Sequence, residues 1–478
     1  MHIFKNRVFI NTIAIYTGEG LCRITTFVVA LLVARRFSAE AFGQYGYAVA
    51  LASVFVLLPD MGLHLMVTRD VAGDHNSLPR TFWNLFWLKT ALVGIVALGG
   101  LIFGALALND HGRRALFYIL AIRALVQTFS LASTSFFKAM ERMQFIALMQ
   151  LANVTVTVLG LVVCVFLKAG LYTTVSTLLA GQVVELLLGW RFMVRHFNPG
   201  PIRKWKSGQI STMLITAIPV GLAAILQAFG VRLDVFILGV FSSNRELGQF
   251  QAAALLIVVS FLATSLLMTA LFPKLARLLR HPTLAGTAFL ESVLKHGIML
   301  ATSASIVVWI AAPGLVPWVF GQSFLPAAQF LRILAPVIPF VFVNTCMLYI
   351  FLAADRRGEY LATLALTTAI GALLLLVLAP RMGGSGAALA DLLREVLASA
   401  IYLYLLHAES RVPSLGPAFL KIVPGAAIAA LAAFLWLSAK GNSEVWAVIW
   451  STAMLGGIFL FAGTPRREQL VLLAKEDL

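Results

Sequence analysis

Charged residues are scarce in this sequence. Only 12% of its 478 residues are Asp, Glu, Lys or Arg, whereas 60% are hydrophobic. A soluble domain of this composition would expose too much apolar surface. The apolar residues form repeated runs of about 20, the length that spans a bilayer as a helix, and the strands of a membrane barrel would be shorter and would alternate in polarity. The composition therefore predicts an all-α, polytopic membrane protein.

Cysteine and the common catalytic motifs are also rare or absent. The three cysteines, Cys22, Cys164 and Cys346, lie in apolar runs and show neither a metal-binding spacing nor a disulfide framework. The sequence has no Walker A motif, no HExxH and no glycine-rich phosphate loop. We therefore expect no metal, no cofactor and no enzymatic activity, and any energy for transport would come from an ion gradient, the membrane potential or consumption of the product.

The net charge of +16 reflects orientation in the membrane rather than nucleic-acid binding. With a cytoplasmic N-terminus, 23 of the 36 Lys and Arg residues lie on the cytoplasmic side, 8 lie on the opposite side and 5 lie inside spans. This bias predicts that both termini are cytoplasmic and that the number of spans is even. The basic N-terminus resembles a signal peptide, but the apolar run behind it is long and charged, so we expect a retained first span.

Fourteen apolar stretches are long enough to cross a membrane, and short loops connect them. A basic segment rich in Pro and Gly, 195–210, reads as a linker between two halves. Prolines in the spans predict helix kinks. The expected spans are 8–34, 43–66, 84–108, 115–137, 145–168, 171–194, 211–240, 248–272, 294–318, 326–352, 360–380, 384–407, 421–438 and 445–462.

The chain also repeats itself weakly. "FGQYGYAVAL" at Phe42 resembles "LGQFQAAALL" at Leu247, and "FKAMERM" at Phe137 resembles "FLAADRR" at Phe351. Each pair occupies the same place in its half. The repeat predicts two parallel six-helix bundles, 1–194 and 211–407, followed by two extra C-terminal helices in 408–462 and a cytoplasmic tail, 463–478. Parallel repeats of this kind are typical of transporters that work by alternating access.

The stretch "VARRFSAEAFGQYGYAVALASVFVLLPDMGLHLMVTRDVA" (33–72) resembles the opening of Wzx-type polysaccharide flippases. These belong to the multidrug/oligosaccharidyl-lipid/polysaccharide (MOP) exporter superfamily. "VRLDVFILGVFSSNRELGQF" (231–250) resembles the family's seventh span, with an acid at Asp234, and "FKAMERM" and "FLAADRR" resemble its fourth- and tenth-span exits. The resemblance covers essentially the whole chain and implies a MATE-like fold.

The resemblance also implies a function. Such proteins move a polyprenyl-pyrophosphate-linked oligosaccharide across the bacterial inner membrane for O-antigen and other lipopolysaccharide, capsule or exopolysaccharide biosynthesis. Its implied partners are the lipid-linked glycan, the lipid bilayer and the glycan polymerase or ligase machinery, without nucleic acid. Two alternatives stay open from the sequence: a MATE-like, cation-coupled multidrug exporter and a lipid II flippase. The glycan, the coupling ion and the oligomeric state are left open.

Charges inside the spans supply candidate site residues, because intramembrane charges are costly and usually functional. Glu19 and Arg23 lie four residues apart in the first span. They either form an ion pair on one helix face or place Arg23 in a cavity, where its planar guanidinium would bind a pyrophosphate. Arg232 and Asp234 lie only two residues apart, so each needs another partner.

The remaining intramembrane charges divide into two groups. Asp391, Arg394 and Glu395 have the spacing of a self-satisfied ion cluster, and we expect Lys89 to extend to the cytoplasmic surface. From the charges inside the spans we predict two kinds of site residue: cations that bind an anionic headgroup in a cavity, and acids that couple transport to an ion. The predicted substrate-binding cations are Arg23, Arg123, Arg232 and Arg332. The predicted ion-coupling acids are Glu19, Asp234, Glu185 and Asp391.

Overall fold

The computed structural model is helical throughout the residues that it describes. These are 2–74, 77–197, 213–215, 217–218, 221, 225, 228–280 and 284–407, with the backbone alone at 2–17, 273, 278–280, 284–291 and 357. The predicted thirteenth and fourteenth spans and the C-terminal tail lie outside the described residues. The chain divides into two compact units, Met1–Phe236 and Ile237–Leu478. Most of the expected linker, 195–210, is not described, so its role stays a prediction.

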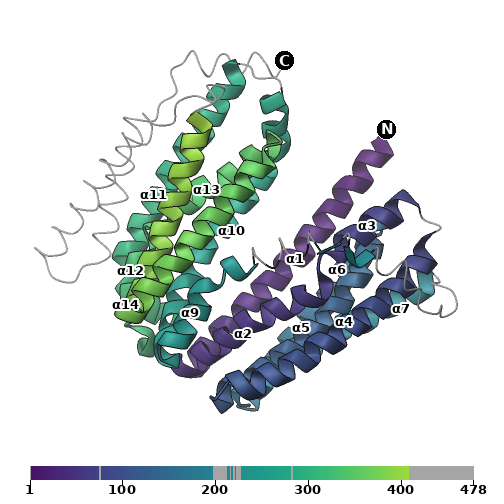
Figure 1. Ribbon diagram of the computed structural model, residues 1–478, viewed down its shortest axis with the longest axis horizontal. Coiled ribbons are helices and arrows are strands. Elements are labelled where there is room, and N and C mark those ends of the chain that lie inside the picture. Colours follow the sequence, from purple (N-terminus) through teal and green to yellow (C-terminus); the bar gives the residue numbers. More distant parts are fainter. Residues whose placement is uncertain are drawn as a thin grey trace, which may run out of the picture. The chain divides into compact units, whose positions relative to one another are not determined.

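The first unit is built from long helices, shown in purple to teal in Figure 1. They are α1 (His2–Arg36), α2 (Ala39–Asp60), α3 (Leu63–Gly73), α4 (Leu78–Ala107), α5 (His111–Ala139), α6 (Met143–Phe166) and α7 (Leu171–Phe197). Helix α5 packs against α2, α4 and α7, and α6 packs against α1 and α7. Helix α5 therefore lies at the centre of this unit.

The second unit repeats much of this plan, and α9 (Leu233–Phe241) leads into it. Its elements are α10 (Asn244–Arg280), α11 (Leu284–Phe320), η2 (Gln322–Phe324), α12 (Ala327–Leu334), α13 (Val337–Ala353) and α14 (Arg357–His407). Helix α10 packs against α13 as α2 packs against α5, and α13 packs against α14. Buried side chains such as Met268, Phe342 and Tyr402 form its core.

Eight of the described helices are long and apolar enough to cross a membrane, or nine if α12 and α13 form one bent span. Helices α12 and α13 meet at 47°, and Pro336 lies in the break between them. Proline lacks the N–H that would continue the helix, so the kink predicted from sequence is present here. The described part of the chain is thus that of an all-helical, multi-pass membrane protein, and the total of fourteen spans stays a prediction because several of them lie partly or wholly outside the described residues.

The second predicted span, 43–66, is not one continuous helix. Helix α2 ends at Asp60 and α3 begins at Leu63. Between them Met61 (φ 40°) and Gly62 (φ 78°) both adopt the left-handed conformation. Pro59, which donates no backbone hydrogen bond, precedes this joint. The apolar run hid the break because hydropathy does not report backbone conformation.

The internal repeat reappears as matching helix ends. Ser38 caps α2 by accepting a 3.2 Å hydrogen bond from Ala41 N, and Ser243 accepts the same bond from Glu246 N at the start of α10. The ends of α5 and α13 match as well. Glu141 (φ 54°) and Asp355 (φ 59°) are both left-handed. The next amide in each half, on Arg142 and Arg356, donates a 2.9 Å hydrogen bond five residues back.

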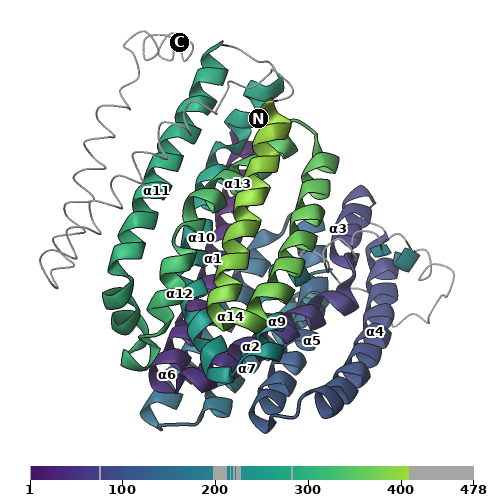
Figure 2. The same ribbon diagram turned by 60° about the vertical axis from the view of Figure 1, so that its left-hand side comes forward.

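Helix α14 is a tight hairpin rather than one rod. Its 51 residues would extend about 77 Å if straight, far beyond a hydrocarbon core of about 30 Å. Gly383 breaks it with a φ of 58° and a ψ of −135°. A Cβ on Gly371 would lie 2.6 Å from Arg394 Cδ, which places the two limbs side by side, as Figure 2 shows. The predicted eleventh and twelfth spans correspond to these limbs.

Gly383 should not tolerate a side chain. A Cβ there would lie 2.0 Å from Glu246 Oε1, which accepts a 2.7 Å hydrogen bond from Gly384 N, and L-residues are strained at this φ. We expect Gly383→Ala to lower the free energy of unfolding by about 1–3 kcal/mol. Thermal unfolding in detergent measures this effect.

Gly358→Ala is the matched control, because nothing lies within 4 Å of its Cβ position on the same helix. Alanine favours helix over glycine, so this variant should melt at or above the native temperature. Equal melting of the two variants would show that the Gly383 turn is not constrained in this way.

Candidate functional site

A polar cavity of about 170 Å³ lies among α1, α5, α6 and α7 of the first unit. Each helix supplies one polar stripe at helical spacing. The stripe on α5 runs through Arg123, Gln127, Ser130, Thr134 and Lys138. The other helices contribute Glu19, Cys22, Thr25 and Thr26 (α1), Gln150, Asn153 and Thr157 (α6), and Gln182 and Glu185 (α7). We call this space the polar cavity.

One wall of the polar cavity is a hydrogen-bonded network around Glu185. The Glu185 carboxylate accepts hydrogen bonds from Asn153 Nδ2 (2.5 Å) and Gln182 Nε2 (3.2 Å). Gln182 Nε2 also lies 3.2 Å from Ser130 Oγ, and Thr157 Oγ1 donates to Asn153 Oδ1. These amides hold the carboxylate in one orientation, so it presents a fixed acceptor to anything in the cavity.

The glycines next to the polar cavity let its helices approach closely. A Cβ on Gly181 would lie 2.2 Å from Thr157 Oγ1, and a Cβ on Gly18 would lie 2.1 Å from Gln150 Oε1. Larger residues at these positions would push the polar side chains into the space that they now line.

Two other polar atoms that line the polar cavity are unsatisfied. Arg123 Nε and Gln150 Oε1 are buried and have no hydrogen-bond partner among the described residues. Buried polar atoms are nearly always paired in folded proteins, so each exception marks a place where a bound group belongs. A donor on Arg123 and an acceptor on Gln150 together suit a polar ligand that both donates and accepts, such as a sugar or a phosphate ester.

The structure places three predicted site residues around this cavity: Glu19, Arg123 and Glu185. Arg23 does not line it and is exposed, and no ion pair joins Arg23 to Glu19 among the described side chains. Arg232 is also exposed, in the turn before α9, and Asp234 lies in the first turn of α9. An acid is favourable there because of the helix dipole. The roles predicted for these residues stay predictions.

The predicted residues of the second unit are engaged with neighbours. Arg332 Nε donates to Trp309 O at 3.4 Å, and its guanidinium stacks 5.3 Å from the Trp309 ring centre. Arg394 pairs with Glu395 at 2.9 Å and with Asp391 at 3.7 Å, the ion cluster that their spacing predicts. Asn344 Nδ2 also donates to Glu395 Oε2 at 2.7 Å and ties α13 to α14.

Lys89 overturns one sequence expectation. Its side chain is fully buried, whereas we expected it to reach the cytoplasmic surface. Its ammonium lies 2.7 Å from Asp60 Oδ1 and donates a 2.8 Å hydrogen bond to Thr128 O. The reason is that Asp60, 1% exposed, offers a carboxylate at the same depth on the neighbouring helix.

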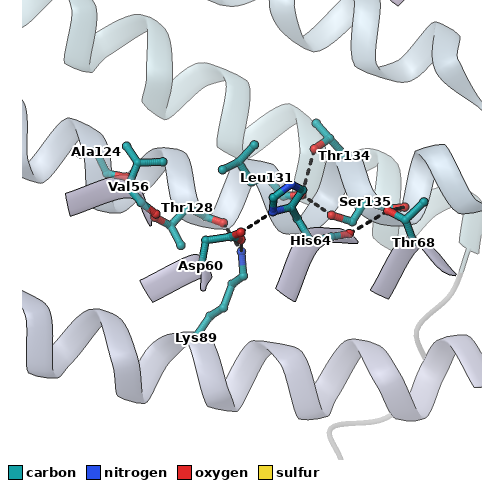
Figure 3. A network of polar contacts seen from close by, with 10 residues as sticks. All are labelled: Val56, Asp60, His64, Thr68, Lys89, Ala124, Thr128, Leu131, Thr134 and Ser135. Carbon is teal, nitrogen blue, oxygen red and sulfur yellow. Dashed lines mark hydrogen bonds and ion pairs between the residues drawn. The ribbon is translucent and has the colours of Figure 1, made fainter. Parts of the chain in front are cut away.

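Asp60 has a second partner, and together these residues form what we call the α2–α3 charge cluster. Figure 3 shows Asp60 between Lys89 and His64, and the His64 Nδ1 contacts the other carboxylate oxygen. His64 is the most accessible of the three, since its side chain is 33% exposed. Sequence reasoning missed the cluster because no spacing rule connects Lys89 to Asp60. The signal it overlooked was a Pro-Asp-x-Gly turn inside an apolar run.

No group of three or more His, Cys, Asp and Glu residues able to hold a metal ion occurs in the described part of the chain. The described residues form a polar cavity and a buried charge cluster, both inside a bundle of helices long enough to span a membrane. Polar sites within membrane-spanning helices are typical of polytopic membrane transporters.

Comparison with known proteins agrees with this class and gives the family. Residues 8–279 match the family of polysaccharide biosynthesis proteins, and the chain belongs to that family. No match was found among curated protein sequences.

Solved structures show the fold. A lipid II flippase, MurJ, in an inward closed conformation is 13% identical with a TM-score of 0.73, over 95% of this chain and 97% of that chain. An inward-facing MATE-family multidrug resistance transporter of the MOP superfamily is 13% identical with a TM-score of 0.61, over 81% and 96%. The Vibrio cholerae MATE transporter VcmN in its bent form is 13% identical with a TM-score of 0.52, over 84% and 97%. The fold is thus the MATE-like fold of MOP-superfamily transporters.

The charge cluster should be energetically coupled. Removing one partner leaves the other charge buried and unpaired, which costs about 3–5 kcal/mol. We therefore expect Lys89→Met alone to lower the free energy of unfolding by that amount. The double variant Asp60→Asn, Lys89→Met should recover most of the loss, because no buried charge then lacks its partner. Denaturation of the purified protein measures both.

The Arg69–Asp70 pair provides the control, because its side chains are 71% and 38% exposed. Exposed ion pairs contribute little, so Arg69→Met should change the free energy of unfolding by less than about 1 kcal/mol. If the double variant is as unstable as the sum of the single variants, Asp60 and Lys89 are not coupled.

Proposed function

We propose that this protein is a Wzx-type flippase, which moves a polyprenyl-pyrophosphate-linked oligosaccharide across the bacterial inner membrane. The observation that carries the proposal is the polar cavity of a polysaccharide biosynthesis family member, buried in a helical bundle and containing an unpaired arginine donor. The headgroup of a lipid-linked glycan is polar and anionic and cannot cross hydrocarbon unaided, because its hydrogen bonds to water must be replaced. The polar side chains of the cavity can form hydrogen bonds that replace those to water.

The residues of the polar cavity fit the parts of such a headgroup. Arg123 and Lys138 are donors for phosphate oxygens, and arginine can bind phosphate bidentately. The amides of Gln127, Gln150 and Asn153 both donate and accept, as sugar hydroxyls require. A volume of about 170 Å³ corresponds to about six water molecules at liquid density. The cavity therefore accommodates one phosphate or one sugar ring, while the polyprenyl tail stays in lipid.

The remaining predicted roles belong to this proposal. Arg23, Arg232 and Arg332 would add positive charge along the path of the headgroup. Glu19, Asp234, Glu185 and Asp391 are the candidates for ion coupling. The protein would lie in the inner membrane with both termini in the cytoplasm, and deliver its product to glycan polymerase or ligase machinery.

Arg123 supplies the first test. We expect Arg123→Met to slow flipping about 10–100-fold, the loss of one charge-assisted hydrogen bond worth about 1.5–3 kcal/mol. Purified protein is placed in liposomes that contain a polyprenyl-pyrophosphate oligosaccharide. The rate at which inner-leaflet glycan becomes accessible to an external glycosidase is the measurement.

The control for Arg123 is Arg191→Met, since Arg191 is exposed on α7 and does not line the polar cavity. It should flip glycan at the native rate. Native flipping by Arg123→Met at equal protein content would remove Arg123 from the pathway. Flipping that also survives Arg23→Ala and Arg232→Ala would end the idea of a phosphate clamp.

Glu185 supplies a second test, of coupling rather than binding. Glu185→Gln keeps an acceptor for Asn153 and removes the charge. If Glu185 carries the coupling ion, the variant should flip glycan slowly at equilibrium and should lose acceleration by an imposed ion gradient. The same liposomes with and without the gradient measure this. Unchanged acceleration would leave Glu185 with a structural role.

A cation-coupled multidrug exporter is the second candidate function. It is favoured by the two carboxylates, Glu19 and Glu185, that share the polar cavity with the two cations. Efflux of a cationic dye from the same liposomes, with no glycan flipping, would select it. A lipid II flippase would instead accelerate lipid II specifically and would restore growth to cells that lack their own lipid II flippase.

A further inference from the structure

The α2–α3 joint is a place where backbone hydrogen bonding does not fix an angle. Two successive left-handed residues, Met61 and Gly62, separate the two helices. Met61 N still donates to Leu57 O, and the amides of Leu65 and Met66 already donate to Gly62 O. The series of helical backbone hydrogen bonds is therefore interrupted at the joint. Side-chain contacts must set the angle between α2 and α3.

One polar side-chain contact crosses this joint directly. His64, in the first turn of α3, contacts the Asp60 carboxylate at the last residue of α2 (Figure 3). Lys89 holds the other oxygen of that carboxylate from α4 and is itself held by Thr128 O of α5. Asp60 is thus fixed to α4 and α5, and α3 is attached to this fixed point through an imidazole.

Two further groups of polar contacts of α3 are described, and neither crosses the joint. Thr68 Oγ1 donates to His64 O and lies 3.3 Å from Ser135 O on α5, and neither is a titratable partner. Arg69 and Asp70 pair with each other on the exposed side. Among the elements packed against α3, α4 carries Lys89 and the exposed Arg80, and Lys138 at the end of α5 lines the polar cavity. The sequence 213–230, whose Met213 and Ala217 share the core of α3, has no charged residue.

His64 is accessible while its partners are not. Its side chain is 33% exposed, whereas those of Asp60 and Lys89 are 1% and 0% exposed. Of the three side chains, the imidazole is thus the one that is not enclosed by the bundle. Histidine is also the side chain that ordinarily changes its charge between pH 5 and 8.

We propose that the Asp60–His64–Lys89 cluster is a proton-binding site that sets the angle between α2 and α3. With His64 neutral, the cluster holds one carboxylate and one ammonium, and the neutral imidazole only hydrogen-bonds to the Asp60 carboxylate. Binding of one proton from water gives an imidazolium, and the cluster gains one positive charge. The contact across the joint then becomes an ion pair between two charged groups and is stronger. Low pH holds α3 against α2, and high pH releases it.

The joint is placed to pass this change along the chain. A Cβ on Gly221 would lie 2.5 Å from the backbone of Met61, so Gly221 touches the joint itself. A change of angle at Met61 must therefore displace the backbone at Gly221. If proton binding at this cluster supplies energy for flipping, the inference rests on the proposed function. Proton binding itself can be measured without any substrate.

The test measures the joint directly in the full-length chain. Cys22, Cys164 and Cys346 are replaced by alanine, and cysteines introduced by Glu40→Cys and Gly73→Cys carry spin labels at the far ends of α2 and α3. Both positions are exposed. We expect the ratio of the two distance populations to change about tenfold between pH 5 and pH 8, within the usual range for coupling of a ligand to a conformational change.

Two substitutions at His64 give opposite predictions. His64→Gln keeps a hydrogen bond but cannot bind the proton, so the distances should stay in the high-pH distribution at both pH values. His64→Lys supplies a permanent cation and should hold the low-pH distribution. His196→Gln is the matched control, because His196 lies exposed on α7 and contacts only Phe192 O and aromatic rings, and the native pH response should persist in it.

The outcomes separate the two proposals. An unchanged native distribution between pH 5 and pH 8, or a pH response that survives in His64→Gln, overturns the proton site. A pH response that His64→Gln abolishes, in a protein that flips no lipid-linked glycan, supports the proton site and rejects the proposed function. Glycan flipping by a protein whose label distances do not change with pH supports the proposed function and rejects the proton site.

Discussion

A charge inside a membrane-spanning bundle must find its partner within the bundle, and the first unit is organised by that constraint. Lys89 could not remain buried without the Asp60 carboxylate 2.7 Å away, and Asp60 could not end α2 at this depth without Lys89. The pair joins three helices, since Lys89 also donates to Thr128 O of α5. It forms beside the weakest point of the backbone, where α2 breaks. The Asp60–Lys89 ion pair therefore both compensates the cost of burying two charges and stabilises the joint between α2 and α3.

The polar cavity meets the same constraint in a different way. The hydrogen bonds to the Glu185 carboxylate come from the amides of Asn153 and Gln182 rather than from a salt-bridge partner. Arg123 Nε and Gln150 Oε1, which also line the cavity, stay unsatisfied within the described part of the protein. A bundle that leaves such atoms unpaired gives up stability at that place, and transporters do so where a substrate replaces the missing partner. The charge cluster supports the scaffold, whereas the cavity is arranged for something that enters and leaves.

The internal repeat explains why two halves of low similarity adopt one plan. The features that recur are the helix caps and the left-handed turns at helix ends. Ser38 and Ser243 start equivalent helices, and Glu141 and Asp355 end equivalent helices in the same left-handed turn. Core side chains between these points differ because apolar packing tolerates exchange when volume is conserved. Caps and left-handed turns tolerate less, so they preserve the repeat.

The sequence by itself determined the membrane class, the helical architecture, most span positions and the repeat, because these follow from hydropathy, helix length and local turn chemistry. It also marked Glu19, Arg123 and Glu185 as unusual, since a charge inside an apolar run is visible without a structure. Only the tertiary structure decided which charges meet. We expected Arg23 to line a cavity and Lys89 to reach the cytoplasmic surface, yet Arg23 is exposed and Lys89 is buried against Asp60. The rotation of each helix about its axis, and the depth at which its neighbours cross it, set that outcome, and both depend on packing between segments far apart in the chain.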